Sequence, residues 1–254
     1  PFSSPPPTLT PSDSRSMSSD STIHDFWEAT SLNGLNFSRF AQRVAGYESE
    51  PTIVDPLAGN EAALGLPLKR DRLQRALQAR RSERRFAPGP LSERTLGQVL
   101  GSLVETAPNQ RLYPSAGGVG CVETYALLNR VESSIGRRAV RYLPDKHSVT
   151  PVRGTLPSSA EIDRLCSLEG TAPPLVLIFA VRLGELHAKY GDRGSRFALI
   201  EVGHACQNVA LRIAADGLAG YQLGGVLDGD LERLLHIGDG RARITLGYAV
   251  GHPG

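Results

Sequence analysis

The chain has 254 residues, of which 40% are hydrophobic and 21% are charged, a composition typical of a globular protein with one sizeable core. Its formal net charge of +2 is too small to indicate a nucleic-acid partner. No apolar run approaches the roughly 20 residues that a membrane span needs, and three cysteines without metal-site spacing indicate reduced thiols. We therefore expect a cytoplasmic protein with no membrane or nucleic-acid partner.

The first 68 residues divide into two segments of different composition. Residues 1–22 are rich in Pro, Ser and Thr, which predicts a flexible arm. Met17 is the only methionine, so we expect natural translation to start there, with residues 1–16 added by cloning. Residues 23–68 contain scattered aromatic residues without a sustained period, and we interpret them as a segment that packs on the main domain or on a partner. The main domain is placed at residues 69–254.

The domain opens with a short amphipathic helix that ends in a run of arginines. Its apolar face is formed by Leu73, Ala76 and Leu77. Guanidinium groups pair bidentately with phosphate oxygens, so the arginines and the serine between them are candidates for gripping a phosphate. A solvated basic face is the alternative. The candidates are Arg80, Arg81, Ser82 and Arg84.

A glycine-rich loop lies in the middle of the chain, after a helix that Ser92 is expected to cap. The loop covers residues 113–123 and precedes a strand at 124–128 and a hairpin at 138–153. Because glycine has no Cβ, this loop can approach a flat ligand closely, although a plain turn would have the same composition. It is not the dinucleotide fingerprint, since the third glycine is missing and a strand follows instead of a helix.

The second half of the domain alternates helices and strands. We predict a short helix around 162–168 and a continuous apolar strand at 174–181 that is covered on both faces. The longest helix carries apolar residues at three- and four-residue spacing between 199 and 214. A helix at 230–236 and an alternating strand at 244–250 complete the chain. Because the elements lack a strict βαβ rhythm, the pattern favours an α+β fold.

Several polar residues in this half are candidates for chemistry. Lys189 and Tyr190 follow the buried strand and could exchange a proton, or could be an exposed lysine beside a packing tyrosine. The longest helix carries Glu201, His204 and the pair Gln207–Asn208. Polar groups on a buried helix must find partners, so they either contact a cofactor or satisfy the core. The histidines are scattered, so we expect no metal site.

Four segments in this order and spacing resemble the FMN-dependent nitroreductase superfamily. More narrowly they resemble its azoline dehydrogenase branch, the SagB-type thiazole/oxazole-forming oxidases. The segments read RRSERRF, YPSAGG, KYGDRGSRFALIEVGHACQN and GLAGYQLGGVLD, with Glu123 and Tyr125 following the second. The resemblance covers roughly residues 68–251. One departure is Val119-Gly120-Cys121, where the branch usually has Leu-Tyr-Pro.

The resemblance implies an α+β fold with a central mixed or antiparallel sheet flanked by helices, in an intertwined homodimer that holds FMN at its interface. By position, the residues implied to contact FMN are Arg80, Arg81, Ser82, Arg84, Pro114, Ser115, Ala116, Gly117, Gln207, Asn208, Gly224 and Gly225. Lys189 and Tyr190 match the catalytic Lys-Tyr pair of the azoline oxidases.

The implied activity is FMN-dependent oxidation of a thiazoline or oxazoline ring to the thiazole or oxazole, in a peptide or a carrier-bound nonribosomal intermediate. A cyclodehydratase or a peptide synthetase would then be a partner. Two alternatives remain: an NAD(P)H-dependent nitro- or quinone reductase of the same fold, and a non-catalytic flavin-binding or scaffold subunit of a cyclase complex.

Overall fold

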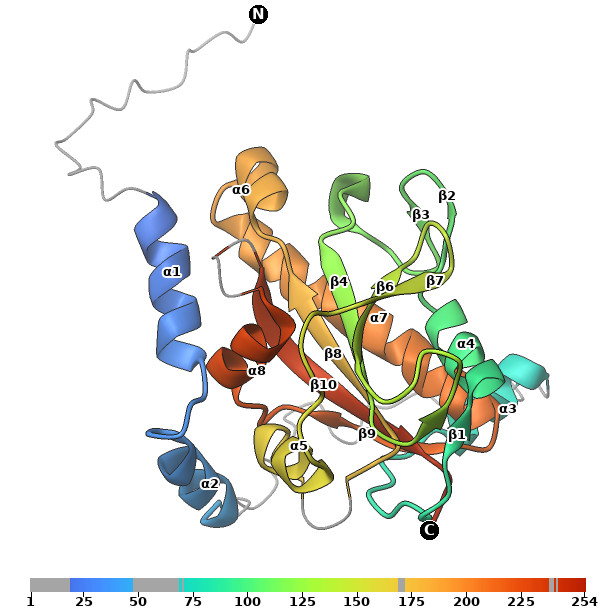
Figure 1. The fold of residues 1–254 in the computed structure, drawn as a ribbon. Helices are drawn as coiled ribbons and strands as arrows, with labels where there is room; N and C mark the ends of the chain where they lie inside the picture. Colours follow the sequence, from blue (N-terminus) through green and yellow to red (C-terminus); the bar gives the residue numbers. More distant parts are fainter. Residues whose placement is uncertain (1–18, 48–68, 70, 169–171, 238–239, 241) are drawn as a thin grey trace, which may run out of the picture.

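The computed structural model describes residues 19–47, 69, 71–168, 172–237, 240 and 242–254. Its centre is a six-stranded sheet in the order β7-β6-β4-β8-β10-β9, in which every neighbouring pair is antiparallel. The strands are β4 (Val122–Leu128), β6 (Ala139–Leu143), β7 (Ser148–Pro151), β8 (Leu175–Val181), β9 (Ala219–Leu223) and β10 (Arg243–Gly251). Helices flank both faces of this sheet, so the predicted α+β class is confirmed (Figure 1).

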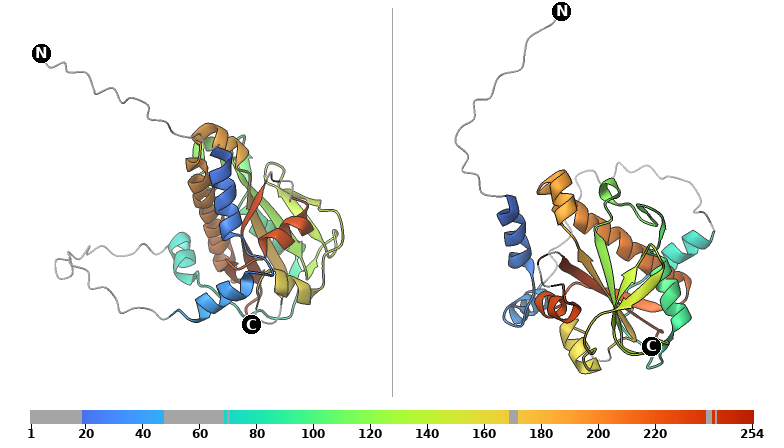
Figure 2. Two further views of the ribbon diagram at one scale, coloured as in Figure 1. Left: turned by 90° about the vertical axis from the view of Figure 1, so that its left-hand side faces the viewer. Right: turned by 45° about the horizontal axis from the view of Figure 1, so that its top comes forward.

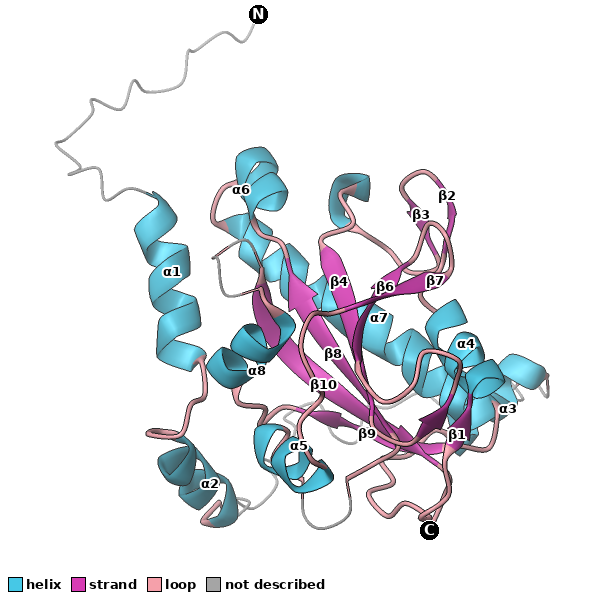
Figure 3. Ribbon diagram, viewed as in Figure 1, coloured by secondary structure: helices cyan, strands magenta, loops and turns pink. Residues whose placement is uncertain are grey.

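The helices and the short strands outside the sheet surround it (Figure 3). The helices are α1 (Ser19–Thr30), α2 (Phe37–Ala45), α3 (Arg72–Ala79), α4 (Glu93–Gly101), α5 (Ser159–Leu165), α6 (Gly184–Tyr190), α7 (Arg193–Ala215) and α8 (Asp228–Leu235), with a 3₁₀ turn η1 (Ala116–Gly118). The short strands are β1 (Leu91–Ser92), β2 (Glu105–Ala107), β3 (Gln110–Arg111) and β5 (Val131–Glu132). The pair β1–β5 is parallel and the pair β2–β3 is antiparallel.

Strand β8 is buried along its whole length, as the continuous apolar run predicts. It pairs with β4 on one side and β10 on the other, and all seven of its residues are buried. Leu177 and Phe179 pack into the cluster that contains the buried face of α7, while Val176 and Ile178 pack into the cluster with α5 and α8. The strand therefore separates two apolar cores, one on each face of the sheet.

Helix α7 is the longest helix of the described chain, with 23 residues, and it crosses one face of the sheet. Its buried positions include Ala198, Val202, Ala205 and Val209, and Gly217 follows its end with a left-handed φ of 69°. Leu199, the first residue of the predicted apolar stripe, is 36% exposed, whereas Val202, Cys206, Val209 and Ile213 of the same stripe are buried.

Strand β10 does not keep the alternation that its sequence predicts. The register with β8 shifts between Ile244 and Leu246, which is a β-bulge. Ile244 consequently packs in the cluster with α5 and α8, whereas Tyr248 and Val250 pack in the cluster with α7. The extra residue thus changes which face the strand's apolar side chains occupy.

The arginine run does not close a helix, contrary to prediction. Helix α3 is capped by Asp71, whose side chain accepts the backbone N–H of Gln74, and it ends at Ala79. Arg80 has extended backbone angles, φ −61° and ψ 118°. The arginines therefore lie on a non-helical segment after the helix.

The segment N-terminal to the domain contacts it through α1 and the turn that follows (Figure 2). Trp27 is 6% exposed and belongs to the cluster that includes α7. The backbone N–H of Leu32 donates to Asp228 Oδ2 at 2.6 Å. Helix α1 begins at Ser19, inside the stretch 1–22 predicted to be flexible. Residues 1–18 of that stretch, and residues 48–68 of the segment predicted at 23–68, lie outside the described residues.

Helix α6 lies against the beginning of α7 at a position where only glycine fits. A Cβ built on Gly194 would lie 2.8 Å from the carbonyl oxygen of Leu186. Real Cβ atoms essentially never approach backbone so closely. The missing side chain of Gly194 therefore sets how closely α6 approaches α7.

Replacing Gly194 with alanine should destabilise the fold by about 1–3 kcal/mol, because backbone of α6 must move to relieve the overlap. Gly97→Ala is the matched control, since a Cβ on this helical glycine meets nothing within 4 Å. It should stabilise by about 0.5–1 kcal/mol, the usual gain of alanine over glycine in a helix. Urea unfolding measures both, and equal effects of the two variants would contradict the packing argument.

Asp228→Asn should stabilise the chain at high pH. Burial raises the pKa of Asp228 to about 6, although the N–H of Leu32 favours the charged form. The folded state therefore binds this proton more tightly than the unfolded state, so the stability from Asp228 is complete below about pH 4 and is lost as the pH rises through 6. The advantage of the variant should grow from pH 5 to pH 8, to at most about 3 kcal/mol. A pH-independent difference in urea unfolding would show that burial does not control this carboxyl.

Candidate functional site

The glycine-rich loop forms a compact turn between β3 and β4. Gly117, Gly118 and Gly120 have φ values of 59°, 70° and 64°, in the left-handed region that favours glycine. Tyr113, which precedes the turn, is 5% exposed, and Cys121, which follows it, is 1% exposed. The loop is therefore held at both ends by buried side chains, while Gly117 at its centre is exposed.

Lys189 and Tyr190 meet this loop at Gly117. The Lys189 Nζ donates a hydrogen bond to the carbonyl oxygen of Gly117 at 3.2 Å. A Cβ built on Gly117 would lie 2.4 Å from both the Lys189 Nζ and the Tyr190 hydroxyl. The Tyr190 ring packs edge-on against Phe197 of α7, with 5.0 Å between ring centroids. Two segments that the sequence marked separately are thus in direct contact.

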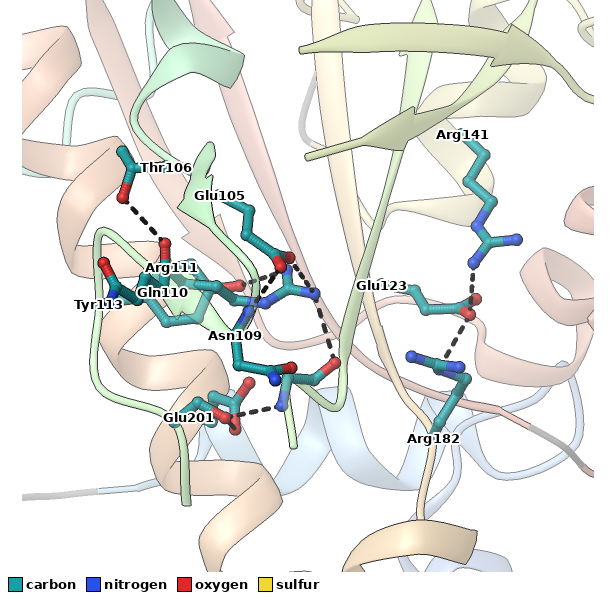
Figure 4. Close-up of polar contacts among 12 residues, drawn as sticks. Glu105, Thr106, Asn109, Gln110, Arg111, Tyr113, Glu123, Arg141, Arg182 and Glu201 are labelled. Atoms are coloured by element: carbon teal, nitrogen blue, oxygen red, sulfur yellow. Dashed lines mark hydrogen bonds and ion pairs between the residues drawn. The ribbon is translucent and has the colours of Figure 1, made fainter. Parts of the chain in front are cut away.

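A partly buried hydrogen-bond network holds the loop (Figure 4). Ser115 Oγ donates to Glu201 Oε2 at 2.8 Å and accepts the backbone N–H of Gly120 at 2.8 Å. From the other side, Arg111 donates to the carbonyl oxygen of Gly120 at 3.4 Å and to the Tyr113 hydroxyl at 3.2 Å. The loop is therefore fixed by a buried carboxylate on one side and a guanidinium on the other.

The environment of this network keeps the neighbouring side chains neutral. Burial raises the pKa of Tyr113 to about 12; the nearby Arg111 charge opposes the rise and the Glu201 charge adds to it. Burial, followed by the Glu201 charge, also raises the pKa of the Cys121 thiol. A thiol with a raised pKa is a poor nucleophile, so Cys121 is a packing residue here.

The arginine segment lies along β9 at the other end of the domain. The backbone N–H of Glu83 donates to the carbonyl oxygen of Gly220 at 3.1 Å, and the Arg84 guanidinium lies 5.1 Å from the centroid of the Tyr221 ring. Glu83 pairs with Arg81 at 3.8 Å and with Arg85 at 3.9 Å. Burial raises the pKa of Tyr248 to about 12, and the charge of nearby Arg80 opposes this.

The guanidinium groups of this segment face solvent, and Ser82 is exposed beside them. A cavity of about 150 Å³ adjoins them, lined by Arg81, Glu83 and the last turns of α7. Arg81 is the cationic residue that lines this cavity, and the Glu83 carboxylate lines it as well. The exposed guanidinium groups and the Ser82 hydroxyl on the same segment are donors of the kind that binds an anion such as phosphate.

The remaining predicted residues are dispersed. Gln207 is exposed on α7, whereas both amide hydrogens of Asn208 are donated to carbonyl oxygens, of Ser102 at 3.2 Å and Leu112 at 2.9 Å. Gly224 is exposed, and the carbonyl oxygen of Gly225 accepts the Ser167 hydroxyl. Asn208 thus holds the backbone that leads into the glycine-rich loop.

Within one chain the arginine segment and the Lys-Tyr pair contact different ends of α7. Arg81 lines a cavity together with Ala210 and Ile213, whereas the Tyr190 ring packs on Phe197. At a rise of about 1.5 Å per residue, Phe197 and Ala210 are roughly 20 Å apart along the helix. Figure 1 shows the same arrangement, with α6 at the N-terminal end of α7 and α3 near its C-terminal end.

Sequence reasoning missed three arginines near the loop and the sheet. Arg111 supports the loop, and Arg141 and Arg182 contact Glu123 at 2.7 and 3.2 Å. The Tyr125 hydroxyl donates to the same carboxylate at 2.8 Å. These contacts depend on the register of β4 with β6 and β8, which local patterns do not reveal. Among the described residues, no three acidic, His or Cys side chains could hold a metal, and no helix has the length and hydropathy of a membrane span.

Comparison with known proteins places the chain in a family. The nitroreductase family model matches residues 77–252. A protein of Methanocaldococcus jannaschii described as a nitroreductase is 28% identical over 183 residues, which are 70% of this chain and 92% of that protein.

Two solved structures share the fold at 21% identity. One is a chain of the E. coli microcin synthetase McbBCD complex with truncated pro-MccB17 bound, with a TM-score of 0.66 over 93% of each chain. The other, from Ralstonia eutropha JMP134 and described as a nitroreductase, has a TM-score of 0.60 over 76% of this chain and 86% of the other. Since the family model covers most of the domain that carries the loop, the Lys-Tyr pair and the arginine segment, the chain belongs to the nitroreductase family of flavin oxidoreductases.

Proposed function

We propose that this protein is an FMN-dependent oxidase that converts a thiazoline or oxazoline ring into a thiazole or oxazole. The observation that carries the proposal is the contact of Lys189 and Tyr190 with Gly117. It places a potential base and a phenol directly over the loop that the family resemblance assigns to the flavin. An ordinary nitro- or quinone reductase needs no such base, because its substrate receives electrons and is not deprotonated at carbon.

The residues present fit FMN. Nitroreductase family proteins are generally FMN-dependent. Arg80, Arg81, Arg84 and Ser82 would hold the phosphate, because their exposed donors match its oxygens. The loop Pro114–Gly117 is assigned to the ring system on the family resemblance, and the missing side chain of Gly117 makes room for Lys189 and Tyr190 beside it. Gln207 and the backbone of Gly224–Gly225 are assigned further contacts on the resemblance alone. When bound, FMN would accept the hydride from the azoline ring carbon and be reoxidised by oxygen.

The protein would supply the base and the orientation. Loss of the Cα proton must accompany loss of the hydride for the ring to become aromatic, and Lys189 or Tyr190 would take that proton. The hydrogen bond from Lys189 to Gly117 and the packing of Tyr190 on Phe197 fix both side chains relative to the loop. Fixed geometry of this kind lowers the entropic part of a barrier.

The site would be assembled by two chains. A single chain holds the proposed phosphate site and the proposed catalytic pair at opposite ends of α7, so we propose a two-fold dimer in which each FMN contacts the arginine segment of one chain and the loop of its partner. Exposed Leu73, Leu77 and Ile200, on α3 and α7, give the dimer apolar surface to bury.

A peptide or carrier-bound substrate is proposed from the likeness to the microcin synthetase chain. That chain belongs to a complex with a truncated pro-peptide, and the match extends over 93% of this chain. A cyclodehydratase or a peptide synthetase would then be the partner that supplies the azoline. The nitroreductase relative of M. jannaschii favours the second candidate, an NAD(P)H-dependent reductase. A non-catalytic flavin-binding or scaffold subunit is the third.

Lys189→Ala and Tyr190→Phe should each lower azoline oxidation at least a hundredfold while FMN stays bound, because the proposed proton transfer uses both groups of the pair and neither is assigned to the phosphate. Lys146→Gln, in the exposed turn after β6, is the control and should keep full activity. The measurements are azole formation by mass spectrometry and the flavin absorbance of the purified protein.

Rapid bleaching of the flavin by NAD(P)H, with azolines inert, would favour the reductase. Purified protein that is colourless and cannot be reconstituted with FMN would exclude every flavin function.

Mixing two inactive variants tests the shared site. Chains with Arg80→Glu and chains with Lys189→Ala should each be inactive alone, for loss of FMN and loss of the base. After re-pairing of an equal mixture, activity should return to about a quarter of the native value, because half of the dimers are mixed and each mixed dimer has one intact site. No recovery, with mixed dimers confirmed by native mass spectrometry, would place both groups in a site within one chain.

A further inference from the structure

We infer that Glu201 is a positioning residue that sets the shape of the flavin-side loop through Ser115. The inference rests on the proposed function, in which Pro114–Gly117 lines FMN. It assigns a role to a buried charge that the proposed chemistry does not use. Glu201 is 1% exposed on the face of α7 that packs against the sheet.

The free-energy cost of burying a carboxylate at this position must be offset by the interactions that it makes. Burying an ionised group is costly unless hydrogen bonds satisfy it, and an apolar residue of similar size would pack here at lower cost. The hydrogen bond that Glu201 accepts comes from the Ser115 hydroxyl at 2.8 Å. Its other oxygen, Oε1, has no nitrogen or oxygen donor among the described residues, and the weakly donating Cys121 thiol lies beside the carboxylate. The interaction that Glu201 makes is therefore directed at the loop.

Ser115 connects Glu201 to the far end of the turn. Its hydroxyl donates to Glu201 and accepts the N–H of Gly120, so it bridges the two ends of the turn that contains Gly117. The carbonyl of Gly120 in turn accepts Arg111, whose side chain is 11% exposed. Both backbone polar groups of Gly120 are thus tied, directly or through Ser115, to buried side chains of opposite charge.

The shape of the turn also determines where Gly117 contacts Lys189 and Tyr190. Gly117 lies between Ser115 and Gly120, and its carbonyl oxygen accepts Lys189. The space that a Cβ on Gly117 would need is filled by the Lys189 Nζ and the Tyr190 hydroxyl. A loop released from Glu201 would change the position of Gly117 under both groups. Glu201 acts on the site without touching the flavin or the substrate.

FMN titration of the flavin-free full-length chain tests the inference, with flavin fluorescence as the signal. Ser115→Ala and Glu201→Leu should each raise the Kd for FMN about tenfold or more, the usual effect of losing a hydrogen bond to a charged group. The double variant should bind no more weakly than the worse single variant, because both changes break the same connection. Glu201→Gln should stay within about threefold of the native Kd, since its amide oxygen can still accept from Ser115. Glu132→Gln, at an exposed position of β5, is the control.

Stability and loop exchange separate positioning from general support of the fold. Glu201→Leu should keep or raise the Tm while it weakens FMN binding, because it removes a buried charge. Hydrogen exchange of the 114–121 segment in flavin-free protein should accelerate at least tenfold in Ser115→Ala and Glu201→Leu, and not in Glu201→Gln. Additive losses of affinity, or unchanged exchange in this segment, would overturn the inference. If the chain binds no FMN, the proposed function fails, and the exchange measurement still decides whether Glu201 holds the loop.

Discussion

The complete burial of β8 is the constraint on which the rest of the structure depends. A strand with seven buried residues needs a hydrogen-bonded neighbour at each edge and an apolar layer on each face. Strands β4 and β10 provide the edges, α7 covers one face, and α5 and α8 cover the other. The two cores on either side of the sheet follow from that one requirement.

The candidate site follows from the same strand. Val122 at the start of β4 pairs with Val181 at the end of β8, and the N–H of Arg182 donates to the carbonyl oxygen of Cys121 at 2.9 Å. The C-terminal end of the glycine-rich loop therefore lies beside the end of β8, just before α6 begins. Because α6 has only seven residues and Gly194 holds it close to α7, Lys189 and Tyr190 lie over the loop.

Local sequence patterns predicted the elements whose signals are local. Strand β8, the hairpin of β6 and β7, and α7 lie where apolar runs and periods indicated them. The predictions were wrong where packing or strand register determines the structure. The bulge in β10 moves Ile244 to the other core. The arginines follow α3 without extending it. For the candidate site, residue type and order marked Lys189, Tyr190 and the loop as candidates, and these lie in contact. Nothing local indicated that Glu201 reaches Ser115 or that Arg111 reaches Gly120, since these contacts join distant parts of the chain.

Hydrogen bonds from two positions on α7 attach the glycine-rich loop to the helix. Glu201 holds the loop through Ser115, and Asn208, seven residues further along the helix, holds the approach to the loop at the carbonyl of Leu112. The two attachment points are roughly 10 Å apart along the helix axis. Tilting or sliding of the loop against α7 would therefore break at least one of these hydrogen bonds. A designer who transplants residues 112–120 into another scaffold would therefore have to carry over Arg111 and the middle of α7 as well, because side chains of both hold the loop.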